Sequence, residues 1–381
     1  MIDFASTLYL GMQHPSTETG SYDTLTTGTP ASLAVSPLSV TVAAQAAALQ
    51  GCEAGMVASS TLHLSIDVLD RLGRTHAIIA DEALYPVMRW GLERIMGLGV
   101  PVAWFRHGDA ADLARHIRQL PHTRPPAVII DATSVEGSPT PIRRYLAIVR
   151  RHSGLLAIDQ SQTLGLLGAR PCASHPWGRG GGGVLRYADI APAEPVLLLA
   201  SWAKAFGAPL ATLCGPAALV NEIARDGPTQ SHCSTASQNA LLAAMNAIAI
   251  NQRDGERLRI ALSRLVARLD DGLRWLGRHR LPDLQTLRRF HPLQQIRLDS
   301  TERTVGLHTA LHARGFRTAL LRQRGSHCAL AVVVRANHRA ADIDALTAAI
   351  GALAPRLSQT REHLTHPVSM EEFGHVQNIR G

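Results

Sequence analysis

Residues 127–159 read AVIIDATSVEGSPTPIRRYLAIVRRHSGLLAID, and this stretch decides the fold class. Its two ends, AVIID and GLLAID, are short continuous apolar runs, which predict buried strands. Between them, residues 142–151 space their apolar side chains at helical intervals and predict an amphipathic helix. A strand, a helix and another strand in this order predict part of a parallel sheet that is covered by helices.

The same alternation continues on both sides of this stretch. Further strands are predicted over residues 55–59, 77–80 and 100–105, and helices over residues 40–49, 62–72, 87–96 and 110–119. This rhythm predicts an α/β fold with a largely parallel sheet and helices on both faces. In such sheets, ligands bind at the carboxyl ends of the strands.

The C-terminal part of the sequence has a different pattern. Two helices are predicted over residues 237–251 and 253–280, followed by strands over 294–298 and 328–334 and a helix over 341–353. We therefore expect three parts: an irregular arm over residues 1–45, a large domain over residues 46–284, and a small α+β domain over residues 285–381.

Composition excludes several classes of protein. Of the 381 residues, 46% are hydrophobic and 18% are charged, so the chain can bury a sizeable core. No apolar run approaches the ~20 residues that cross a bilayer, and the first residues lack the pattern of a secretory leader. The five cysteines are scattered without a CxxC pair, which predicts reduced thiols in the cytoplasm and no metal site.

The net charge of +8 raises the alternative of a nucleic-acid partner. However, the arginines of residues 253–280 alternate with Asp, Glu and Leu at helical spacing, which is typical of a solvated helix face. Aromatic residues make up only 4% of the chain, and no zinc-finger spacing is present. We expect neither a nucleic-acid nor a membrane partner.

The ratio of arginine to lysine gives the first indication of the protein's chemistry. Of the 38 basic residues, 37 (38 − 1) are arginine, and Lys204 is the one lysine. Arginine replaces lysine in most ion pairs, but it does not lose its proton and cannot act as an amine nucleophile. Schiff-base formation with a carbonyl is the chemistry that requires lysine, although a single lysine can also survive by chance.

A second residue gives Lys204 its context. Lys204 follows the apolar run VLLLAS, and Asp159 ends the run GLLAID, so both are predicted at strand ends. A lysine that holds an aldehyde and an aspartate that keeps a pyridine nitrogen protonated are what pyridoxal 5′-phosphate requires. Taken alone, Asp159 could equally be a helix cap.

One further motif is the glycine-rich run GRGGGG over residues 178–183. It lacks the GK[ST] ending of a phosphate-binding P-loop. We interpret it as a flexible surface connection.

Several segments resemble the α-oxoamine synthases, which condense an amino acid with an acyl thioester. Residues 201–216, SWAKAFGAPLATLCGP, resemble the family's TLSKAFG…G segment, and residues 46–60, AAALQGCEAGMVASS, resemble its LAALEGAEAALVFSSG. Residues 131–168 follow its SMDGDIAPL, helix and LLLVDDAHGTGVLG pattern. Ser234–Thr235 fits its FSTS, and residues 317–335 are similar to its TAIRPP…RLRL. The resemblance covers most of the chain.

This resemblance implies a fold-type-I pyridoxal-phosphate-dependent transferase, with a mostly parallel seven-stranded sheet and a smaller α+β domain. It implies that Lys204 forms the Schiff base and shuttles protons, and that Asp159 pairs with the pyridinium nitrogen. Arg322 matches the arginine that grips the amino-acid carboxylate, with Arg324 as the alternative. The remaining implied cofactor contacts are Ser201 and the backbone of Thr61 and Leu62 at the phosphate, Ser134, and Ser234 and Thr235 from the neighbouring subunit of a homodimer.

Two substitutions separate this sequence from the family pattern. Tyr85 stands where the family stacks a histidine on the cofactor ring, and Gln162 stands where a histidine contacts the ring hydroxyl. Tyrosine stacks equally well, but neither residue supplies an imidazole that titrates near neutral pH. His327 lies in the altered segment RQRGSH and is a candidate for that lost role.

The leading functional expectation is decarboxylative condensation of an amino acid with an acyl-CoA or acyl-carrier thioester, giving an α-aminoketone in a specialised biosynthetic pathway. The alternative on the same fold is an aminotransferase or lyase, which needs no thioester site. The non-enzyme alternative is a binding or regulatory protein that keeps the fold, and the retained lysine argues against it.

Overall fold

The computed structural model describes residues 1–14, 25–26, 28–33, 35–121, 123–133, 140–287, 291–322 and 328–359. The chain forms two compact units. The larger one spans Met12–Arg257, and the smaller one combines Met1–Gly11 with Leu258–Gly381. The boundaries expected at residues 45/46 and 284/285 stay a prediction.

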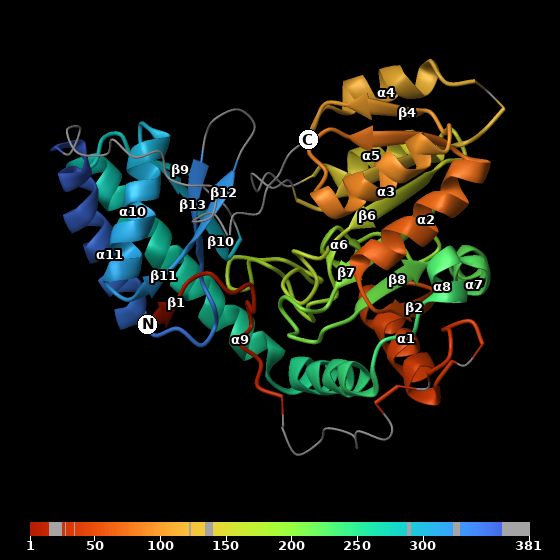
Figure 1. The fold of residues 1–381 in the computed structure, drawn as a ribbon, viewed down its shortest axis with the longest axis horizontal. Helices are drawn as coiled ribbons and strands as arrows, with labels where there is room; N and C mark the ends of the chain where they lie inside the picture. Colours follow the sequence, from red (N-terminus) through yellow and green to blue (C-terminus); the bar gives the residue numbers. More distant parts are fainter. Residues whose placement is uncertain are drawn as a thin grey trace. The chain divides into compact units, whose positions relative to one another are not determined.

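The larger unit is built on a sheet of seven strands in the order β2-β8-β7-β6-β5-β3-β4 (Figure 1). The strands from β7 through β4 are parallel to one another, and β8 runs antiparallel to both of its neighbours, β2 and β7. The α/β fold with a mostly parallel seven-stranded sheet is therefore confirmed. The strands are β2 (Ala54–Ala58), β3 (Ala77–Asp81), β4 (Val102–Phe105), β5 (Pro126–Asp131), β6 (Leu155–Asp159), β7 (Val196–Ser201) and β8 (Ala211–Gly215).

Helices cover both faces of this sheet. On one face, α2, α3 and α7 share a hydrophobic cluster with alternate strand residues such as Ile78 and Ile129. On the other face, Phe105 packs edge-on against Tyr145 of α5, with ring centroids 5.4 Å apart. The helices of this unit are α1 (Pro37–Gln50), α2 (Thr61–Thr75), α3 (Pro86–Gly97), α4 (Ala110–Arg118), α5 (Ile142–Arg150), α6 (Val184–Tyr187), α7 (Ala217–Asp226) and α8 (Pro228–His232).

The glycine-rich run 178–183 is not a surface connection, and that interpretation is wrong. Gly181, Gly182 and Gly183 are buried. Gly183 has φ 87°, and a Cβ there would lie 2.0 Å from Oε1 of Gln160. The same oxygen accepts a hydrogen bond from the Val184 N–H at 3.0 Å. The glycines therefore allow the backbone to pack tightly against the end of β6.

The two helices predicted over residues 237–251 and 253–280 are one continuous helix, α9 (Gln238–His279), of 42 residues. Its first part belongs to the larger unit, and its residues from Leu258 onward belong to the smaller one. No proline interrupts it, and Gly255 at the expected break is accommodated within the helix. A single interior glycine costs only about 1 kcal/mol relative to alanine, which a long helix can absorb.

The smaller unit has the α+β character that the sequence predicted. An antiparallel sheet in the order β12-β13-β10-β9 is accompanied by helices, and the short strand β1 (Ile2–Asp3) pairs in parallel with β11 (Phe316–Arg317). The other elements are β9 (Gln285–Leu287), β10 (Leu293–Arg297), β12 (Ala319–Arg322), β13 (Cys328–Val333), α10 (Thr301–Ala313), α11 (Ala340–Leu353) and the 3₁₀ helix η3 (Ala354–Gln359).

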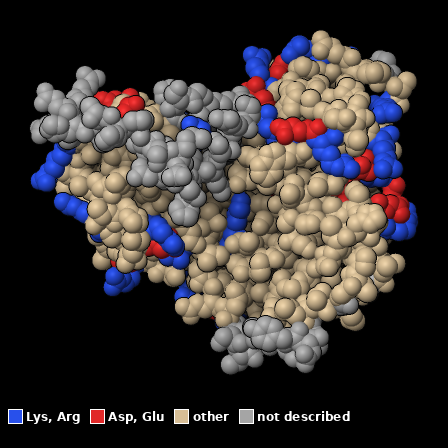
Figure 2. Space-filling model, in the orientation of Figure 1, with Lys and Arg blue, Asp and Glu red and all other residues tan. Residues whose placement is uncertain are grey.

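Charge is dispersed over the surface. On the face shown in Figure 2, Lys and Arg side chains form no single basic patch, and several adjoin acidic groups. Arg106 and Arg115, for example, pair with Asp109 and Asp112. Within the described residues, no helix combines the length and the apolar character needed to cross a membrane.

Candidate functional site

The site residues predicted in the larger unit lie along one edge of its sheet. β2 runs in the same direction as β7, because each is antiparallel to β8 between them. The carboxyl ends of β2, β3, β5, β6 and β7 therefore meet at the same edge, where ligands bind in open α/β sheets. Asp131 and Asp159 are the last residues of β5 and β6. Thr61, Tyr85 and Lys204 follow within four residues of the ends of β2, β3 and β7.

Lys204 lies in the turn after β7, above a buried polar network. Trp202 is fully buried, and its indole N–H donates to Oγ1 of Thr212 at 2.9 Å. Gln50 also donates to Thr212, at 3.4 Å, and accepts from the side chain of Gln160 at 2.6 Å. This network satisfies the polar groups beneath the turn and fixes the backbone that carries the lysine.

Asp159 ends β6 and is buried. Its Oδ1 accepts from the Ser161 N–H at 2.8 Å, and the Ser161 hydroxyl accepts from the Ser201 N–H at the same distance. These bonds tie the end of β6 to the end of β7. The carboxylate of Asp159 and the turn of Lys204 are thus held on adjacent strands.

Tyr85 lies directly before α3, and the structure brings it next to Lys204. The lysine Nζ is 5.7 Å from the centroid of the Tyr85 ring. The Tyr85 N–H donates to Oδ2 of Asp131 at 2.7 Å, which fixes the start of this turn. Burial first, and then the charge of Asp159, raises the pKa of the Tyr85 hydroxyl. The ring therefore stays neutral at physiological pH.

The surroundings of Lys204 change the pKa of its amine. Burial lowers its pKa below the usual range of lysine, and the charge of Asp159 is the largest cause that opposes this shift. A lowered pKa increases the fraction of neutral amine, which is the form that attacks an aldehyde.

Asp131 was not among the residues singled out from the sequence. It is buried, it pairs in register with Asp159 on the neighbouring strand, and its Oδ1 has no hydrogen-bond partner among the described residues. Burial first, and then the charge of Asp159, raises its pKa well above the usual range of aspartate. The signal that could have found it is its position, because AVIID ends in aspartate as GLLAID does.

The start of α2 has two N–H groups to offer to an anion. The hydroxyl of Ser60 caps the helix by accepting from the His63 N–H. The N–H groups of Thr61 and Leu62, in the first turn, have no acceptor within the helix and lie at its positive end. Nearby, the Ser59 hydroxyl donates to the backbone oxygen of Ser234 at 3.0 Å in the same chain.

The remaining predicted residues fall into three groups. Gln162 lies in the turn after β6, and Thr235 follows Ser234 before α9, so both belong to the larger unit. Arg322 ends β12 in the smaller unit, where it pairs in register with Cys328. Ser134, Arg324 and His327 lie outside the described residues.

These groups match the chemistry of pyridoxal 5′-phosphate. Lys204 supplies an amine of lowered pKa, Asp159 a buried carboxylate, and Tyr85 an aromatic ring beside the amine. The first turn of α2 supplies N–H groups suited to a phosphate. Asp131 adds a buried oxygen that no described residue satisfies, which marks this edge as built for more than packing.

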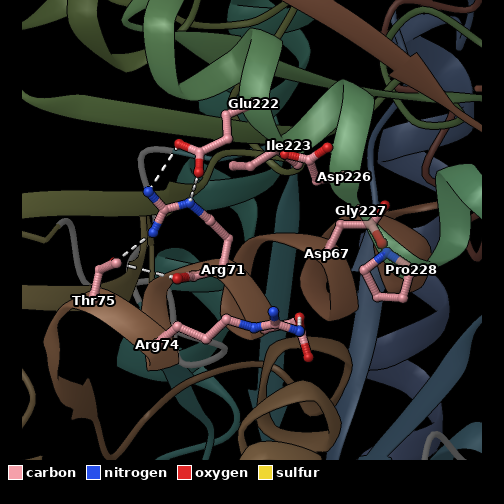
Figure 3. Close-up of a pocket in the computed structure, with 10 residues that line it drawn as sticks. Asp67, Arg71, Arg74, Thr75, Glu222, Ile223, Asp226, Gly227 and Pro228 are labelled. Atoms are coloured by element: carbon pink, nitrogen blue, oxygen red, sulfur yellow. Dashed lines mark hydrogen bonds and ion pairs between the residues drawn. The ribbon is translucent and has the colours of Figure 1, made fainter.

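A hollow of about 290 Å³ lies away from this site, between α2, α7 and α8 (Figure 3). Both of its arginines pair with acidic side chains that also line it. Arg71 forms a bidentate pair with Glu222 and also donates to the Thr75 hydroxyl at 2.7 Å. Arg74 pairs with Asp70 at 2.8 Å. Because these charges are already matched, this hollow lacks the unsatisfied groups found at the sheet edge.

Comparisons with known proteins agree with this geometry. Residues 43–302 match the model of the family described as aminotransferase class I and II. The chain is 26% identical over 323 residues to the 8-amino-7-oxononanoate synthase of Halorhodospira halophila, covering 84% of this chain and 75% of that protein.

Two solved structures share the architecture. A structure of SPT with the pyridoxal phosphate internal aldimine superposes with a TM-score of 0.81 at 15% identity, over 94% of this chain and 88% of that one. The 8-amino-7-oxononanoate synthase of Francisella tularensis gives a TM-score of 0.70 at 14% identity, over 94% and 98% of the two chains. At this identity the likeness concerns the fold, and the fold-type-I prediction is confirmed.

Proposed function

Because the chain belongs to the aminotransferase class I and II family, as its resemblance to the α-oxoamine synthases predicted, we propose that it is a pyridoxal-phosphate-dependent acyltransferase. The proposed reaction joins an amino acid to an acyl thioester, releases carbon dioxide and the free thiol, and gives an α-aminoketone. One observation carries the proposal: the chain's one lysine, with a lowered pKa, lies at the same sheet edge as the buried Asp159.

When bound, the cofactor supplies an aldehyde that links to an amine and a pyridinium ring that accepts electrons from the amino-acid Cα. In this proposal the Lys204 amine binds the aldehyde and then moves protons at the substrate. Asp159 holds a proton on the ring nitrogen by charge pairing. Tyr85 and Gln162 take the places of two histidines, one by packing against the ring and one by hydrogen bonding.

The phosphate contacts follow from the first turn of α2. In the proposal, the N–H groups of Thr61 and Leu62 and the Ser201 hydroxyl bind the phosphate. Arg322, or Arg324 in its place, binds the amino-acid carboxylate, and Ser134 contacts the cofactor.

The enzyme is further proposed to be a cytoplasmic homodimer. Ser234 is exposed and Thr235 half-buried, so both could contact a phosphate in a partner subunit. All five cysteines are free thiols, which suits a reducing compartment. Light scattering on the purified chain measures the dimer. Mixing Lys204→Ala with a Ser234→Ala, Thr235→Ala double variant should restore activity only if sites are shared.

The decisive assay screens amino acids with the holoenzyme, with and without acyl thioesters. Release of free thiol that depends on both substrates supports the proposal. Amino transfer to a keto acid without thiol release would replace it with the aminotransferase reading, which the tyrosine beside Lys204 also suits. A protein that binds cofactor and substrates without turnover would point to a binding or regulatory role.

A further inference from the structure

At the sheet edge, the hydrogen bonding of the Asp131 carboxyl is half complete among the described residues. Its Oδ2 accepts from the Tyr85 N–H at 2.7 Å, while its Oδ1 is buried and has no partner among the described residues. A buried carboxylate oxygen without a donor is costly, whereas a protonated carboxyl at the same place carries a much smaller penalty.

The charges that face Asp131 make this cost larger. Asp159 lies beside it in register, and Asp81 approaches from β3. Both oxygens of Asp81 have hydrogen-bond partners, because Oδ1 accepts from the Ala83 N–H and Oδ2 lies 2.8 Å from Nδ1 of the His107 ring. Lys204 is the cation that acts on both strand-end carboxyls.

At the adjacent ends of β5, β6 and β7, the described residues place two carboxyls and one amine, those of Asp131, Asp159 and Lys204. If both Asp131 and Asp159 were ionised, a single ammonium would face two adjacent anions in a buried place. Like charges in contact cannot both ionise easily, so one carboxyl keeps its proton. Asp159 is the better anion: each aspartate accepts one backbone N–H, but only Asp131 has an oxygen that is buried without a partner among the described residues, and Asp159 acts more strongly on Lys204.

We propose that Asp131 is a neutral, protonated carboxylic acid in the folded protein, acting as a positioning residue. Its Oδ2 anchors the backbone of Tyr85, and its neutrality leaves Asp159 as the anion that sets the charge state of Lys204. The catalytic consequence rests on the proposed function, because a second anion would hold the amine in its unreactive form.

The test uses the fact that the chain has one lysine. Protein labelled with lysine carrying ¹³C at the ε carbon gives a single resonance, whose shift with pH reports the ionisation of Lys204 without cofactor or substrate. The compared proteins are the wild type, Asp131→Asn, Asp159→Asn and, as a matched control, Asp67→Asn, a buried aspartate on α2.

Asparagine imitates a protonated aspartate, since its oxygen can still accept the Tyr85 N–H. We therefore expect the midpoint of Asp131→Asn and of Asp67→Asn to equal that of the wild type. Asp159→Asn removes a nearby anion and should lower the midpoint by about one pH unit or more. A shift in Asp131→Asn as large as that in Asp159→Asn would show that Asp131 is ionised and would overturn the proposal.

A second measurement needs no stable Asp131 variant. The wild type at neutral pH should show the infrared carbonyl band of a protonated carboxylic acid. Absence of this band from the wild type contradicts the proposal. Both measurements are independent of thiol release, so an enzyme with another reaction could still have a neutral Asp131.

Discussion

Two buried aspartates of the larger unit, Asp67 and Asp131, have opposite surroundings. Asp67, on α2, accepts from the backbone N–H and the hydroxyl of Thr229 and from the Gln230 side chain. Asp131 accepts one hydrogen bond, and its second oxygen has no partner among the described residues. Both are buried, so burial alone does not distinguish them.

This difference in hydrogen bonding distinguishes a residue that stabilises the fold from residues that can bind a ligand. The bonds of Asp67 join α2 to α8, and a fully satisfied carboxylate of this kind stabilises the contact it makes. The sheet edge instead leaves one Asp131 oxygen unpaired among the described residues, near the Lys204 amine and the N–H groups that start α2. Such a site is less stable, but its groups can bind a ligand. Substitutions at the two places should therefore act on different quantities.

The largest effect is expected at Lys204. Lys204→Ala should abolish the cofactor band near about 410–430 nm and reduce turnover on the order of 10⁴-fold or more, because no other side-chain amine exists. Absorbance of the protein incubated with pyridoxal phosphate and thiol release measure the two effects. Circular dichroism should stay that of the wild type. A wild type that remains colourless with the cofactor would show that the sheet edge does not bind pyridoxal phosphate through Lys204.

Asp159→Asn should leave the cofactor bound but lower kcat by about 10²-fold. Losing an opposite charge lowers the pKa of the ring nitrogen by about one to three units, and each unit corresponds to about tenfold. Steady-state kinetics should show the loss in kcat with KM for the amino acid little changed. A loss confined to KM would assign Asp159 to substrate binding instead.

At Asp67 the effect should appear in stability. Asp67→Ala leaves the Thr229 and Gln230 donors buried without an acceptor and should cost about 2–5 kcal/mol in the free energy of unfolding. Urea unfolding measures this cost. The single lysine resonance should keep its midpoint in any Asp67 variant that folds. Near-wild-type stability of Asp67→Ala would mean that the hydrogen bonds of Asp67 do not stabilise the contact between α2 and α8.

Asp131 should make the free energy of unfolding depend on pH. Its pKa is raised in the folded state, so the folded protein holds a proton that the unfolded chain loses. Stability should therefore fall as pH rises from the unfolded pKa toward the folded one, by about 1.4 kcal/mol per unit between them. Asp131→Asn removes this slope, and subtracting its unfolding curve from that of the wild type cancels the titration of Lys204. Equal slopes in the two proteins would contradict a raised pKa.

How far the sequence predicted these features depends on how local they are. The strand and helix rhythm of residues 77–159 predicted the parallel sheet, because apolar periodicity is a local property. Lys204 and Asp159 followed from their strand ends and from the family resemblance. The bond from Trp202 to Thr212 and that from Ser59 to Ser234 join segments that no periodicity relates.

Two errors have the same origin. Asp131 ends a strand as Asp159 does, so its position could be predicted from the sequence. Its unpaired oxygen could not, because that depends on how the folded chain packs around it. The composition of residues 178–183 predicted a flexible surface connection, but Gly183 packs against Gln160 and Gly182 against the backbone of Leu49. In both cases a tertiary contact decided what the local pattern meant.

The smallest expected effect is at the start of α2. One turn there contains an N–H group that a side chain caps, that of His63, and two N–H groups proposed to bind phosphate, those of Thr61 and Leu62. Ser60→Ala removes the cap of the His63 N–H and should cost about 1 kcal/mol of unfolding free energy. Ser36→Ala, which removes the equivalent cap of α1, is the matched control and should cost about the same. Cofactor affinity, measured by the visible band, should change little in either variant, because Thr61 and Leu62 keep their N–H groups. A much weaker affinity in Ser60→Ala alone would mean that the cap itself holds the phosphate, so that architecture and function share one side chain there.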